Sequence, residues 1–589
     1  MRVADYIADY LVREGVTHVF SLSGGGFMHT LDGLSRNPEL NIIFHHHEQA
    51  AGMAAEAYAR ARNGIGICFA TSGPGSTNLT TAIAGAYLDS APVVFIVGQS
   101  KVSQTIRHAN VKGLRQFGTF EVDSVSISEG LTKESFFVER ANDIPYIFEK
   151  AFVSAQSGRP GPILIEIPID IQGAQIDFDR ISSFSWDYND PALTDEQLEC
   201  VLGKISDSSK PLLLIGHGVR VSGGVSEFLK FVDTIGVPVV STQLGKDSIS
   251  YNHDLFIGHV GTRGDRAGNA AVQSADLIIS IGSSLHTFTT GYETDLFAPD
   301  AMIVQVDTDA SNFEKGGVSV DIRIHSDVKL FLKKMNSAVQ RCHLDMHLNW
   351  VTWNQKNKRN FPVYGEGHKV EKGALNIYHS LEIMNTFSPS DSIVIGDAGS
   401  VFFVLGHAWK VKEGQRVLIS GGLGSMGWSL PAATGAAIAS RDKKVICMTG
   451  DGSLMTNVHE LSVMVGYNLN IVVVVFNNNG YISIKNTQQS YFNDHFSGVN
   501  SESGVYMPDL KMLTESMGMV HHRVECDIEL KNIFQMAMEK RGPVFIEVIS
   551  NQSQEIIPAV LSKKMADGTM QSQSLNSMFP FLDDNFSFE

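Results

Sequence analysis

The residues best suited to chemistry lie in the last third of the sequence, at the ends of two short apolar runs. The run 445–448 stops at Gly450-Asp451-Gly452, and the run 471–476 stops just before Asn478 and Gly480. Both runs have the length and β-branched content of buried parallel strands, and the residues between them have helical spacing. Parallel strands joined by a crossover helix end at the same edge of a sheet. Asp451, Asn478 and a backbone carbonyl are therefore expected to converge.

Such a group of oxygens suits Mg²⁺, which completes its coordination with phosphate oxygens. Glycines on both sides of Asp451 would let the backbone approach a diphosphate, and the start of the following helix offers free N–H groups. The pattern predicts a site for a metal ion and a diphosphate. A lone Gly-Asp-Gly is also a common tight turn, so the prediction depends on the asparagines that follow at the second strand end.

Size and composition indicate a multidomain cytoplasmic protein. The 589 residues are enough for about three or four domains. A formal net charge of −17 argues against nucleic-acid and anionic-membrane partners, and no apolar stretch is long enough to span a bilayer. Asp5 and Asp9 interrupt the start, where a signal peptide needs an apolar core. The five scattered cysteines indicate neither disulfides nor a zinc cluster.

Strand-like runs alternate with helical segments along most of the chain, which predicts an α/β fold of doubly wound parallel sheets. We expect an N-terminal domain (1–176), a central domain (198–340), a third domain (373–550) and a C-terminal tail (551–589). The tail is expected to pack on the protein itself, and the alternative is a lid over a site. Segments 158–168 and 541–548 share a Gly-Pro-apolar-Glu sequence pattern, which suggests that the first and third domains have the same fold. The central domain could be purely structural, or its Gly216-His217-Gly218 loop could hold a nucleotide.

Four segments together resemble a known family: His45-His46-His47-Glu48, 71–78, 421–427 and 450–479. They are similar to the acetolactate synthase branch of the thiamin diphosphate-dependent decarboxylases and carboligases, over nearly the whole chain. The resemblance implies three doubly wound parallel-sheet domains, which are the pyrimidine-binding, central and diphosphate-binding domains. It implies thiamin diphosphate and Mg²⁺ as cofactors. It also implies a homodimer or homotetramer, because in this superfamily the catalytic glutamate and the diphosphate site come from different subunits.

Functional positions carry over from the family residue by residue. Glu48 matches the glutamate that hydrogen-bonds the aminopyrimidine ring, and Met426 matches the bulky residue that bends the cofactor. Asp451, Asn478 and the Gly480 carbonyl match the metal ligands. The other positions implied to bind the cofactor are Gly25, Ser400, Val401, Gly424, Gly450, Gly452, Ser453 and Tyr481. Taken alone, Glu48 could be an ordinary acid in a first helical turn and Met426 a core residue.

The chain departs from the family pattern at the substrate and flavin positions. Thr119 and Phe120 stand in place of a Phe-Gln pair, and Thr487 stands in place of a tryptophan that selects the acceptor. These three residues are our candidates for substrate contact, and they favour an acceptor other than the standard one. Ser284 and Phe288 replace two arginines expected to hold a flavin. Whether FAD binds is therefore left open.

Histidines offer a second set of catalytic candidates. His29 follows a Gly24-Gly25-Gly26 turn, and His46 and His47 precede Glu48, a pattern that resembles synthase-like proteins of surface-polysaccharide pathways. An imidazole can donate or accept a proton near neutral pH, so we assign His29 and His47, with His46 as an alternative to His47, to the donor carboxylate or the acceptor carbonyl. The competing interpretation is that each imidazole only makes hydrogen bonds within a turn or at a strand end and has no catalytic role.

The resemblance implies decarboxylation of a small 2-oxo acid, with pyruvate as the expected donor, and ligation of the two-carbon unit to a second carbonyl compound. One alternative is a decarboxylase that releases an aldehyde without ligation. Another is transfer of the acetyl unit to a keto-sugar nucleotide. A non-enzymatic scaffold is disfavoured because Glu48 is present.

Overall fold

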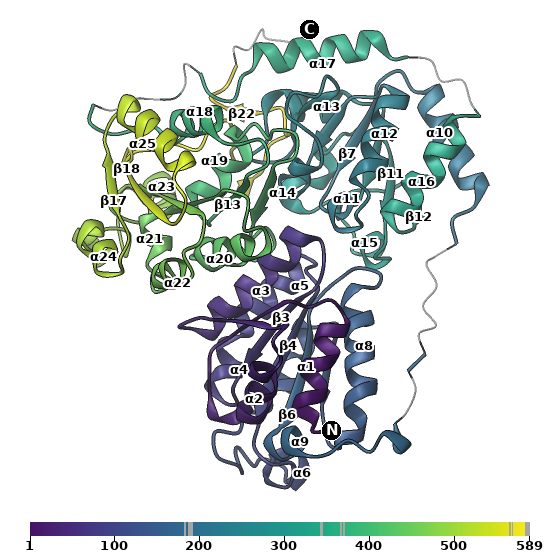
Figure 1. The fold of residues 1–589 in the computed structure, drawn as a ribbon. Helices are drawn as coiled ribbons and strands as arrows, with labels where there is room; N and C mark the ends of the chain where they lie inside the picture. Colours follow the sequence, from purple (N-terminus) through teal and green to yellow (C-terminus); the bar gives the residue numbers. More distant parts are fainter. Residues whose placement is uncertain are drawn as a thin grey trace.

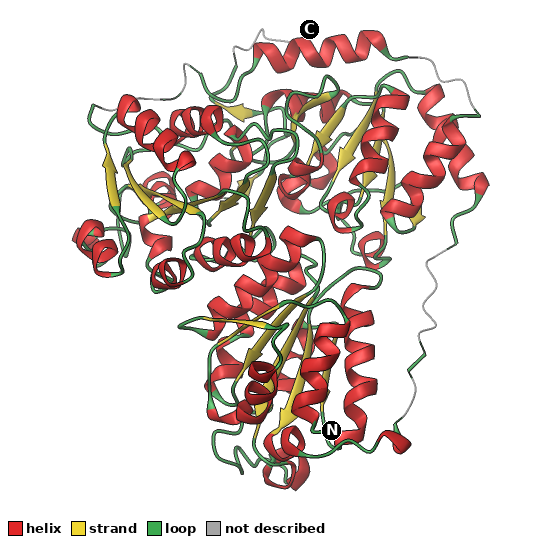
Figure 2. Cartoon of the chain, viewed as in Figure 1, coloured by secondary structure: helices red, strands yellow, loops and turns green. Residues whose placement is uncertain are grey.

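Three six-stranded parallel sheets, covered by helices, make up the protein (Figure 1). The structure is a computed structural model that describes residues 1–181, 184–185, 192–341, 346–365, 368, 372–564, 567 and 569–582. The predicted α/β fold with three doubly wound parallel sheets is confirmed, and Figure 2 shows helices layered against the strands of each sheet. Parts of the segments that separate the three sheets, and the last residues of the tail, lie outside the described residues.

The first sheet has the order β2-β1-β3-β4-β6-β5. Its strands are β1 (His18–Ser21), β2 (Asn41–Phe44), β3 (Gly66–Ala70), β4 (Val93–Gln99), β5 (Glu134–Phe137) and β6 (Ile163–Pro168). Its helices are α1 (Val3–Arg13), α2 (Met28–Arg36), α3 (Glu48–Arg62), α4 (Pro74–Asn78), α5 (Thr80–Leu88), α6 (Ile106–Ala109), α7 (Ser124–Ser128), α8 (Ile144–Gln156) and α9 (Ile169–Gly173).

The central sheet has a different order, β12-β11-β10-β7-β8-β9. Its strands are β7 (Pro211–Ile215), β8 (Val239–Ser241), β9 (Phe256–His259), β10 (Leu277–Ile281), β11 (Met302–Asp307) and β12 (Ile322–His325). The helices around it are α10 (Asp195–Asp207), α11 (Gly218–Val221), α12 (Val225–Ile235), α13 (Arg266–Ser274), α14 (Thr287–Thr290), α15 (Ser311–Glu314), α16 (Val328–Val339) and α17 (Leu348–Asn360).

The third sheet, β14-β13-β15-β16-β18-β17, repeats the strand order of the first, as the shared Gly-Pro-apolar-Glu sequence pattern suggested. Its strands are β13 (Ile393–Gly396), β14 (Arg416–Ile419), β15 (Val445–Gly450), β16 (Ile471–Asn477), β17 (His521–Val524) and β18 (Val544–Ile549). Its helices are α18 (Ile377–Phe387), α19 (Ser400–Ala408), α20 (Ser429–Ala439), α21 (Asp451–Leu454), α22 (Glu460–Gly466), α23 (Ile482–Tyr491), α24 (Leu510–Ser516) and α25 (Asp527–Glu539).

The crossover between β15 and β16 differs from a single helix. It consists of α21 and α22, separated by a turn in which Asn457 is buried and donates a hydrogen bond to the Gly427 carbonyl at 3.0 Å. The two strands run parallel in direct register, from Val445 opposite Ile471 to Gly450 opposite Phe476. Their carboxyl ends therefore lie at one edge of the sheet, as the sequence predicted.

The segment after β18 returns to the central sheet. Its short strands are β19 (Ala559–Val560), β20 (Lys563–Lys564), β21 (Met570–Gln571) and β22 (Met578–Phe579). Leu575 and Met578 are buried in the same apolar cluster as Ala271, and the Asn269 side chain donates a hydrogen bond to the Leu575 carbonyl at 3.1 Å. The described part of the tail thus packs on its own chain. No helix in the described ranges is long and apolar enough to cross a membrane.

Two buried imidazoles are predicted to make stability depend on pH. Burial lowers the pKa of His407 to about 3, and it lowers the pKa of His259 well below its ordinary value. Histidines in the unfolded chain titrate near 6.5, so the unfolded state binds more protons below that pH. Each of these two histidines should therefore contribute a decrease in the free energy of unfolding as the pH drops from about 6.5, of roughly 1.4 kcal/mol per pH unit. Urea unfolding at several pH values measures this slope.

The variant His259→Gln supplies the control. It removes one titrating group, so its slope between about pH 6 and 5 should be lower than that of the wild type by roughly 1.4 kcal/mol per pH unit. An identical slope in both proteins would show that His259 does not carry this dependence.

Candidate active site

Two buried oxygens without hydrogen-bond partners mark the predicted metal site. Asp451 begins α21 and Asn478 follows β16, and each has its Oδ1 atom buried and unpaired. The other carboxylate oxygen of Asp451 accepts a hydrogen bond from the Gly480 N–H at 2.9 Å. Buried polar atoms are nearly always satisfied, so an unpaired carboxylate oxygen and an unpaired amide oxygen at one sheet edge fit a bound cation.

The loop after β16 is shaped to present these oxygens. Asn479 and Gly480 have φ values of 59° and 148°, and a Cβ atom on Gly480 would lie 2.0 Å from the Val499 carbonyl oxygen. Only glycine fits this position. Burial raises the pKa of Asp451 to about 6, and hydrogen bonds from backbone N–H groups, first that of Gly480, oppose the rise. A cation would supply the missing counter-charge.

The donor set suits Mg²⁺ better than a transition metal. One carboxylate, one amide and one backbone carbonyl are hard oxygen donors that leave room for phosphate oxygens. Across the residues that the structure describes, no group of three or more His, Cys, Asp or Glu side chains could hold a metal ion.

The predicted diphosphate contacts surround this edge. Gly399, with a φ of 72°, leads into α19, where the Ser400 hydroxyl lies 3.3 Å from that of Ser483. Val401 is 3 % exposed with its side chain in the core, so only its backbone could touch a ligand. Gly450 precedes α21, in which Gly452 and Ser453 are buried. A Cβ atom on Gly452 would lie 2.2 Å from the Tyr481 ring, so that ring packs directly on α21.

Asp397 is a site residue that the sequence interpretation missed. It is fully buried, and its Oδ1 atom accepts hydrogen bonds from the N–H groups of Ala398 and of Gly427, the latter at 2.9 Å. Its other oxygen accepts from the hydroxyls of Ser429 and Thr449. Asp397 therefore ties the end of β13 to the loop that carries Met426. The Gly396-Asp397 phrase at a strand end, similar to Gly450-Asp451, was the available signal.

Met426 is 42 % exposed, so core packing within one chain does not account for it. It lies between Gly424 and Gly427, which have φ values of 67° and 73°. Gly424 is itself exposed. The loop that leads into α20 thus presents the flexible apolar side chain of Met426, which is free to contact a ligand or another surface.

Glu48 lies in the first domain, as the first residue of α3. It is 6 % exposed, and the Asn78 side chain donates a hydrogen bond to its Oε2 atom at 3.0 Å. Asn78 ends α4, which follows β3, so Glu48 lies at the carboxyl edge of the first sheet. Glu48 and the Asp451 group therefore occupy corresponding edges of two sheets that share one topology.

Of the predicted histidines, His47 has a local role in the fold. The Nδ1 atom of His47 accepts a hydrogen bond from the Gln49 N–H at 3.1 Å and so caps α3. His46 is exposed. His29 is half-buried in the first turn of α2, with its ring 3.5 Å from where a Cβ atom on Gly173 would lie. Gly25 is exposed in the short 3-10 helix (Gly25–Phe27) before α2.

The candidate substrate residues lie at both sheet edges. Phe120 is 70 % exposed with a φ of 57°, and its carbonyl oxygen is 2.6 Å from where a Cβ atom on Gly73 would lie. Because Gly73 leads into α4, Thr119 and Phe120 are near the start of the short helix that ends at Asn78. Thr487 is exposed on α23, and its hydroxyl donates to the Ser483 carbonyl at 3.1 Å. Thr487 is therefore on the Asp451 side.

At the position where flavin-binding arginines were expected, the structure has an aromatic group. Phe288 stacks on His286 and lies near Phe402 and Phe403, at ring-centroid distances of 6.5 and 6.3 Å. The Lys315 ammonium donates to the Ser284 carbonyl, so it is engaged with the backbone there.

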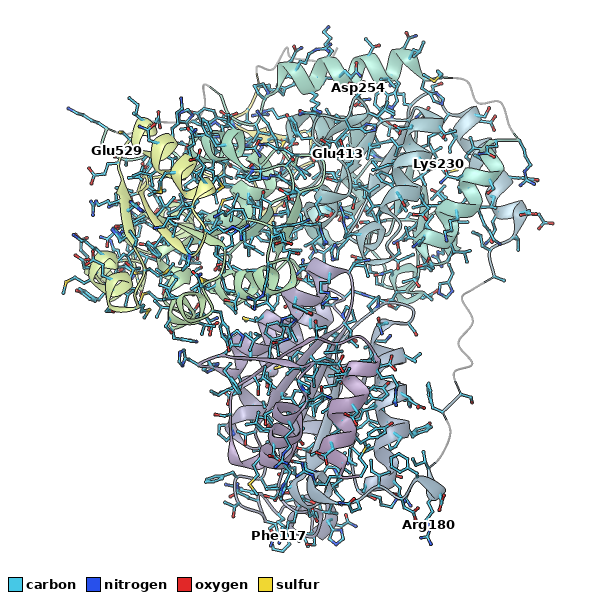
Figure 3. All side chains as sticks on the ribbon, in the orientation of Figure 1. Phe117, Arg180, Lys230, Asp254, Glu413 and Glu529 are labelled. Atoms are coloured by element: carbon cyan, nitrogen blue, oxygen red, sulfur yellow. The ribbon has the colours of Figure 1, made fainter. Side chains whose placement is uncertain are left out.

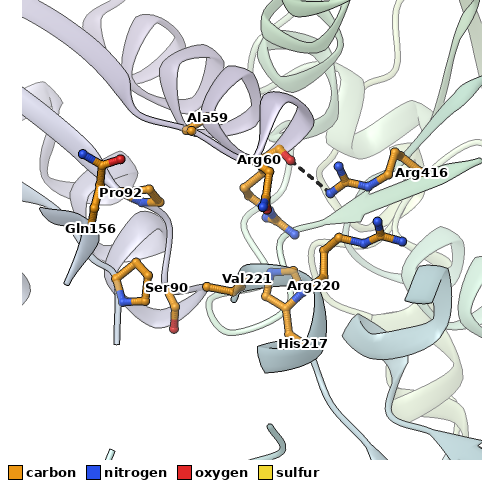
Figure 4. Close-up of a pocket in the computed structure, with 12 residues that line it drawn as sticks. Ala59, Arg60, Ser90, Pro92, Gln156, His217, Arg220, Val221 and Arg416 are labelled. Carbon is orange, nitrogen blue, oxygen red and sulfur yellow. Dashed lines mark hydrogen bonds between the residues drawn. The ribbon is translucent and has the colours of Figure 1, made fainter. Parts of the chain in front are cut away.

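Three arginines, one from each domain, line a cavity of about 120 Å³ where the domains meet (Figure 4). Arg60, Arg220 and Arg416 come from the first, central and third domains. Arg60 donates to Glu56 at 2.9 Å, while Arg416 donates to Asp247 at 2.8 Å and to the Arg60 carbonyl at 3.0 Å. His217 of the Gly216-His217-Gly218 loop lines this cavity, whereas the residues predicted to bind thiamin diphosphate, the metal ion or the substrate do not. Its arginines are engaged with acids and carbonyls, which indicates a structural role.

Comparison with known domain families covers all three parts of the chain. Residues 1–118 match the N-terminal TPP binding domain of thiamine pyrophosphate enzymes, residues 198–335 the central domain, and residues 397–548 the C-terminal TPP binding domain. The chain belongs to the thiamine pyrophosphate enzyme family. This thiamine pyrophosphate enzyme therefore uses thiamin diphosphate, as predicted, and is an enzyme of the transferase or lyase type.

Its relatives include acetolactate synthases. The chain is 31 % identical to the probable acetolactate synthase large subunit of Methanococcus aeolicus, over 93 % of this chain and 92 % of that protein. It is 30 % identical to the acetolactate synthase large subunit of Lactococcus lactis, over the same shares of both chains. It is 31 % identical to acetolactate synthase 2, chloroplastic, of Nicotiana tabacum, over 95 % of this chain and 83 % of that protein.

The unpaired oxygens of Asp451 and Asn478 give a direct test of the metal site in this thiamine pyrophosphate enzyme. Asp451→Asn keeps the shape of the side chain but removes its charge. We expect the dissociation constant of thiamin diphosphate in the presence of Mg²⁺ to rise by at least about 100-fold, because Mg²⁺ binding depends on a carboxylate. Isothermal titration calorimetry with and without Mg²⁺ measures this change.

The matched control is Asp494→Asn, which changes an exposed acid with positive φ in the loop after α23. It should bind the cofactor as the wild type does. If Asp451→Asn retained wild-type, Mg²⁺-dependent affinity, the assignment of Asp451 as a metal ligand would be wrong.

Proposed function

We propose that this thiamine pyrophosphate enzyme decarboxylates a small 2-oxo acid, with pyruvate as the expected donor, and joins the two-carbon unit to a second carbonyl compound. The observation that carries the proposal is the pair of unpaired oxygens on Asp451 and Asn478, at the sheet edge that corresponds to the edge holding Glu48. The similarity to proteins named acetolactate synthase supports ligation as the outcome.

Thiamin diphosphate, when bound, supplies a nucleophilic carbon and accepts the electron pair that decarboxylation releases. The chain holds and orients it. Asp451, Asn478 and the Gly480 carbonyl would bind Mg²⁺, and Ser400 with the first turns of α19 and α21 would bind the diphosphate. Met426 would pack against the rings. The Glu48 carboxylate would exchange a proton with the pyrimidine ring nitrogen, and Asn78 keeps that carboxylate in place.

A second copy of the chain is proposed to complete each site. Glu48 is held by Asn78 within the first domain, whereas the Asp451 group is built from the third domain alone. Exposed apolar residues accompany both edges, with Phe120 on the first domain and Met426 on the third. Burial of such residues against a partner would remove apolar surface from water and exclude water from the reacting carbon.

The acceptor is proposed to be larger than pyruvate. Thr487 and Thr119 are short side chains at positions where the resemblance led us to expect tryptophan and phenylalanine. Both are exposed, so they leave space at the two edges. A hydroxyl at each position could also donate a hydrogen bond to a polar acceptor.

Product analysis tests the proposal. The enzyme with thiamin diphosphate and Mg²⁺ is given ¹³C-labelled pyruvate and a panel of aldehydes, 2-oxo acids and keto-sugar nucleotides, and products are identified by mass spectrometry. We expect labelled CO₂ and a ligated product that carries two labelled carbons. Labelled acetaldehyde without any ligated product would instead indicate a simple decarboxylase, and the absence of CO₂ release from every 2-oxo acid offered would overturn the proposal.

A further inference from the structure

A basic loop borders the Glu48 edge of the first domain. The chain has a formal net charge of −17, yet no Asp or Glu occurs between Asp89 and Glu121. Lys101, Lys112 and Arg115 fall within this stretch. We call residues 101–118, which run from the end of β4 towards Thr119, the basic loop. In a protein this acidic, a stretch that carries only positive charge beside the candidate site indicates that the site binds a negatively charged ligand.

Most of the cations in the basic loop are available. Lys101, Lys112 and Arg115 are exposed, and among the described residues their side chains have neither an ion-pair nor a hydrogen-bond partner. Arg107 is the exception, because it pairs with Asp123 at 2.9 Å. Two further acids touch the loop through its backbone: Asp170, which accepts a hydrogen bond from the Val102 N–H at 3.1 Å, and Glu121.

The loop is held in one shape by Glu121, which is 3 % exposed. One of its carboxylate oxygens accepts hydrogen bonds from the Phe117 and Gly118 N–H groups at 2.7 and 3.0 Å, and the other accepts from the Ile106 N–H. The Ser100 hydroxyl adds a bond to the Thr119 carbonyl at 2.9 Å. Cations on a fixed loop lose less conformational entropy on binding than cations on a mobile one.

The position of the loop connects it with the site. It is followed by Thr119 and Phe120, and the Phe120 carbonyl packs on the Gly73 turn that leads to Asn78 and hence to Glu48. Phe117 and Phe120 are 56 % and 70 % exposed and offer apolar surface next to the cations. Figure 3 labels Phe117 at the end of the first domain that faces away from the other two domains of its own chain.

We propose that the basic loop recognises a phosphate group on the carbonyl acceptor. This inference rests on the proposed function and names the class of acceptor, a carbonyl compound that carries one or more phosphates. Lys112 and Arg115 would contact the phosphate, since Lys offers a compact charge and Arg a fork of N–H donors. Phe120, at the base of the loop, would face the part of the acceptor between the phosphate and the carbonyl that reacts.

Glyceraldehyde 3-phosphate and glyceraldehyde form a matched pair of probes, because they share the reacting carbonyl and differ in the phosphate. With pyruvate as donor, the ratio of kcat/KM for the phosphorylated over the neutral acceptor should exceed about tenfold in the wild type. The double variant Lys112→Gln/Arg115→Gln should bring that ratio close to one. Raising the salt concentration should lower the wild-type ratio, because salt screens exposed charges.

The control is Lys230→Gln/Lys356→Gln, which removes two exposed charges from the central domain and its neighbouring helix α17. It should keep the wild-type ratio. A wild-type ratio near one, or an unchanged ratio in the loop variant, would overturn the inference. A loop variant that loses its oligomeric state in sedimentation would also overturn it, because the loop would then be a contact with a second copy. Wild-type CO₂ release from pyruvate without phosphate discrimination would refute this inference alone, whereas no CO₂ release would refute the proposed function.

Discussion

The close contact between α3 and α20 is the constraint on which both candidate half-sites depend. A Cβ atom on Gly435 would lie 2.0 Å from the Ala54 carbonyl oxygen, so the two helices approach backbone to backbone. Nearby, the Trp428 indole donates to Glu56 at 3.0 Å, and the Arg60 guanidinium lies over the Trp428 ring. Because Glu48 begins α3 and the Met426 loop leads into α20, this packing fixes the start of each element relative to the other.

The same fold serves two different tasks in the first and third domains. Both sheets carry a buried glutamate on the corresponding strand, Glu166 on β6 and Glu547 on β18. Burial raises the pKa of Glu166 to about 7, whereas Glu547 pairs with His521 at 2.8 Å. We propose that the chemistry is added at the carboxyl edges, where one copy of the fold would provide Glu48 and the other Asp451 and Asn478. On this proposal, function resides in the loops that follow shared strands.

Features encoded by local pattern could be predicted from the sequence, and features made by distant contacts could not. The runs before Asp451 and Asn478 predicted two parallel strands ending together, because strand length and β-branched residues are local signals. The four hydrogen-bonding partners of Asp397 come from three separate segments, and Gly435 meets Ala54 from another domain. The hydrophobic periodicity of a sequence gives no signal for contacts between distant segments. The helix cap that His47 forms was also not predicted, and its catalytic role stays a prediction.

The central claim is that Glu48 of one chain and Asp451 of another form one site. Glu48→Gln and Asp451→Asn, each inactive alone, are co-expressed with different tags, and the mixed dimer is isolated through both tags. A shared site leaves one intact centre in that dimer, so ligation per dimer should reach about half the wild-type rate. A mixed dimer as inactive as its two parents would contradict the account, because Glu48 and Asp451 would then have to act within a single chain.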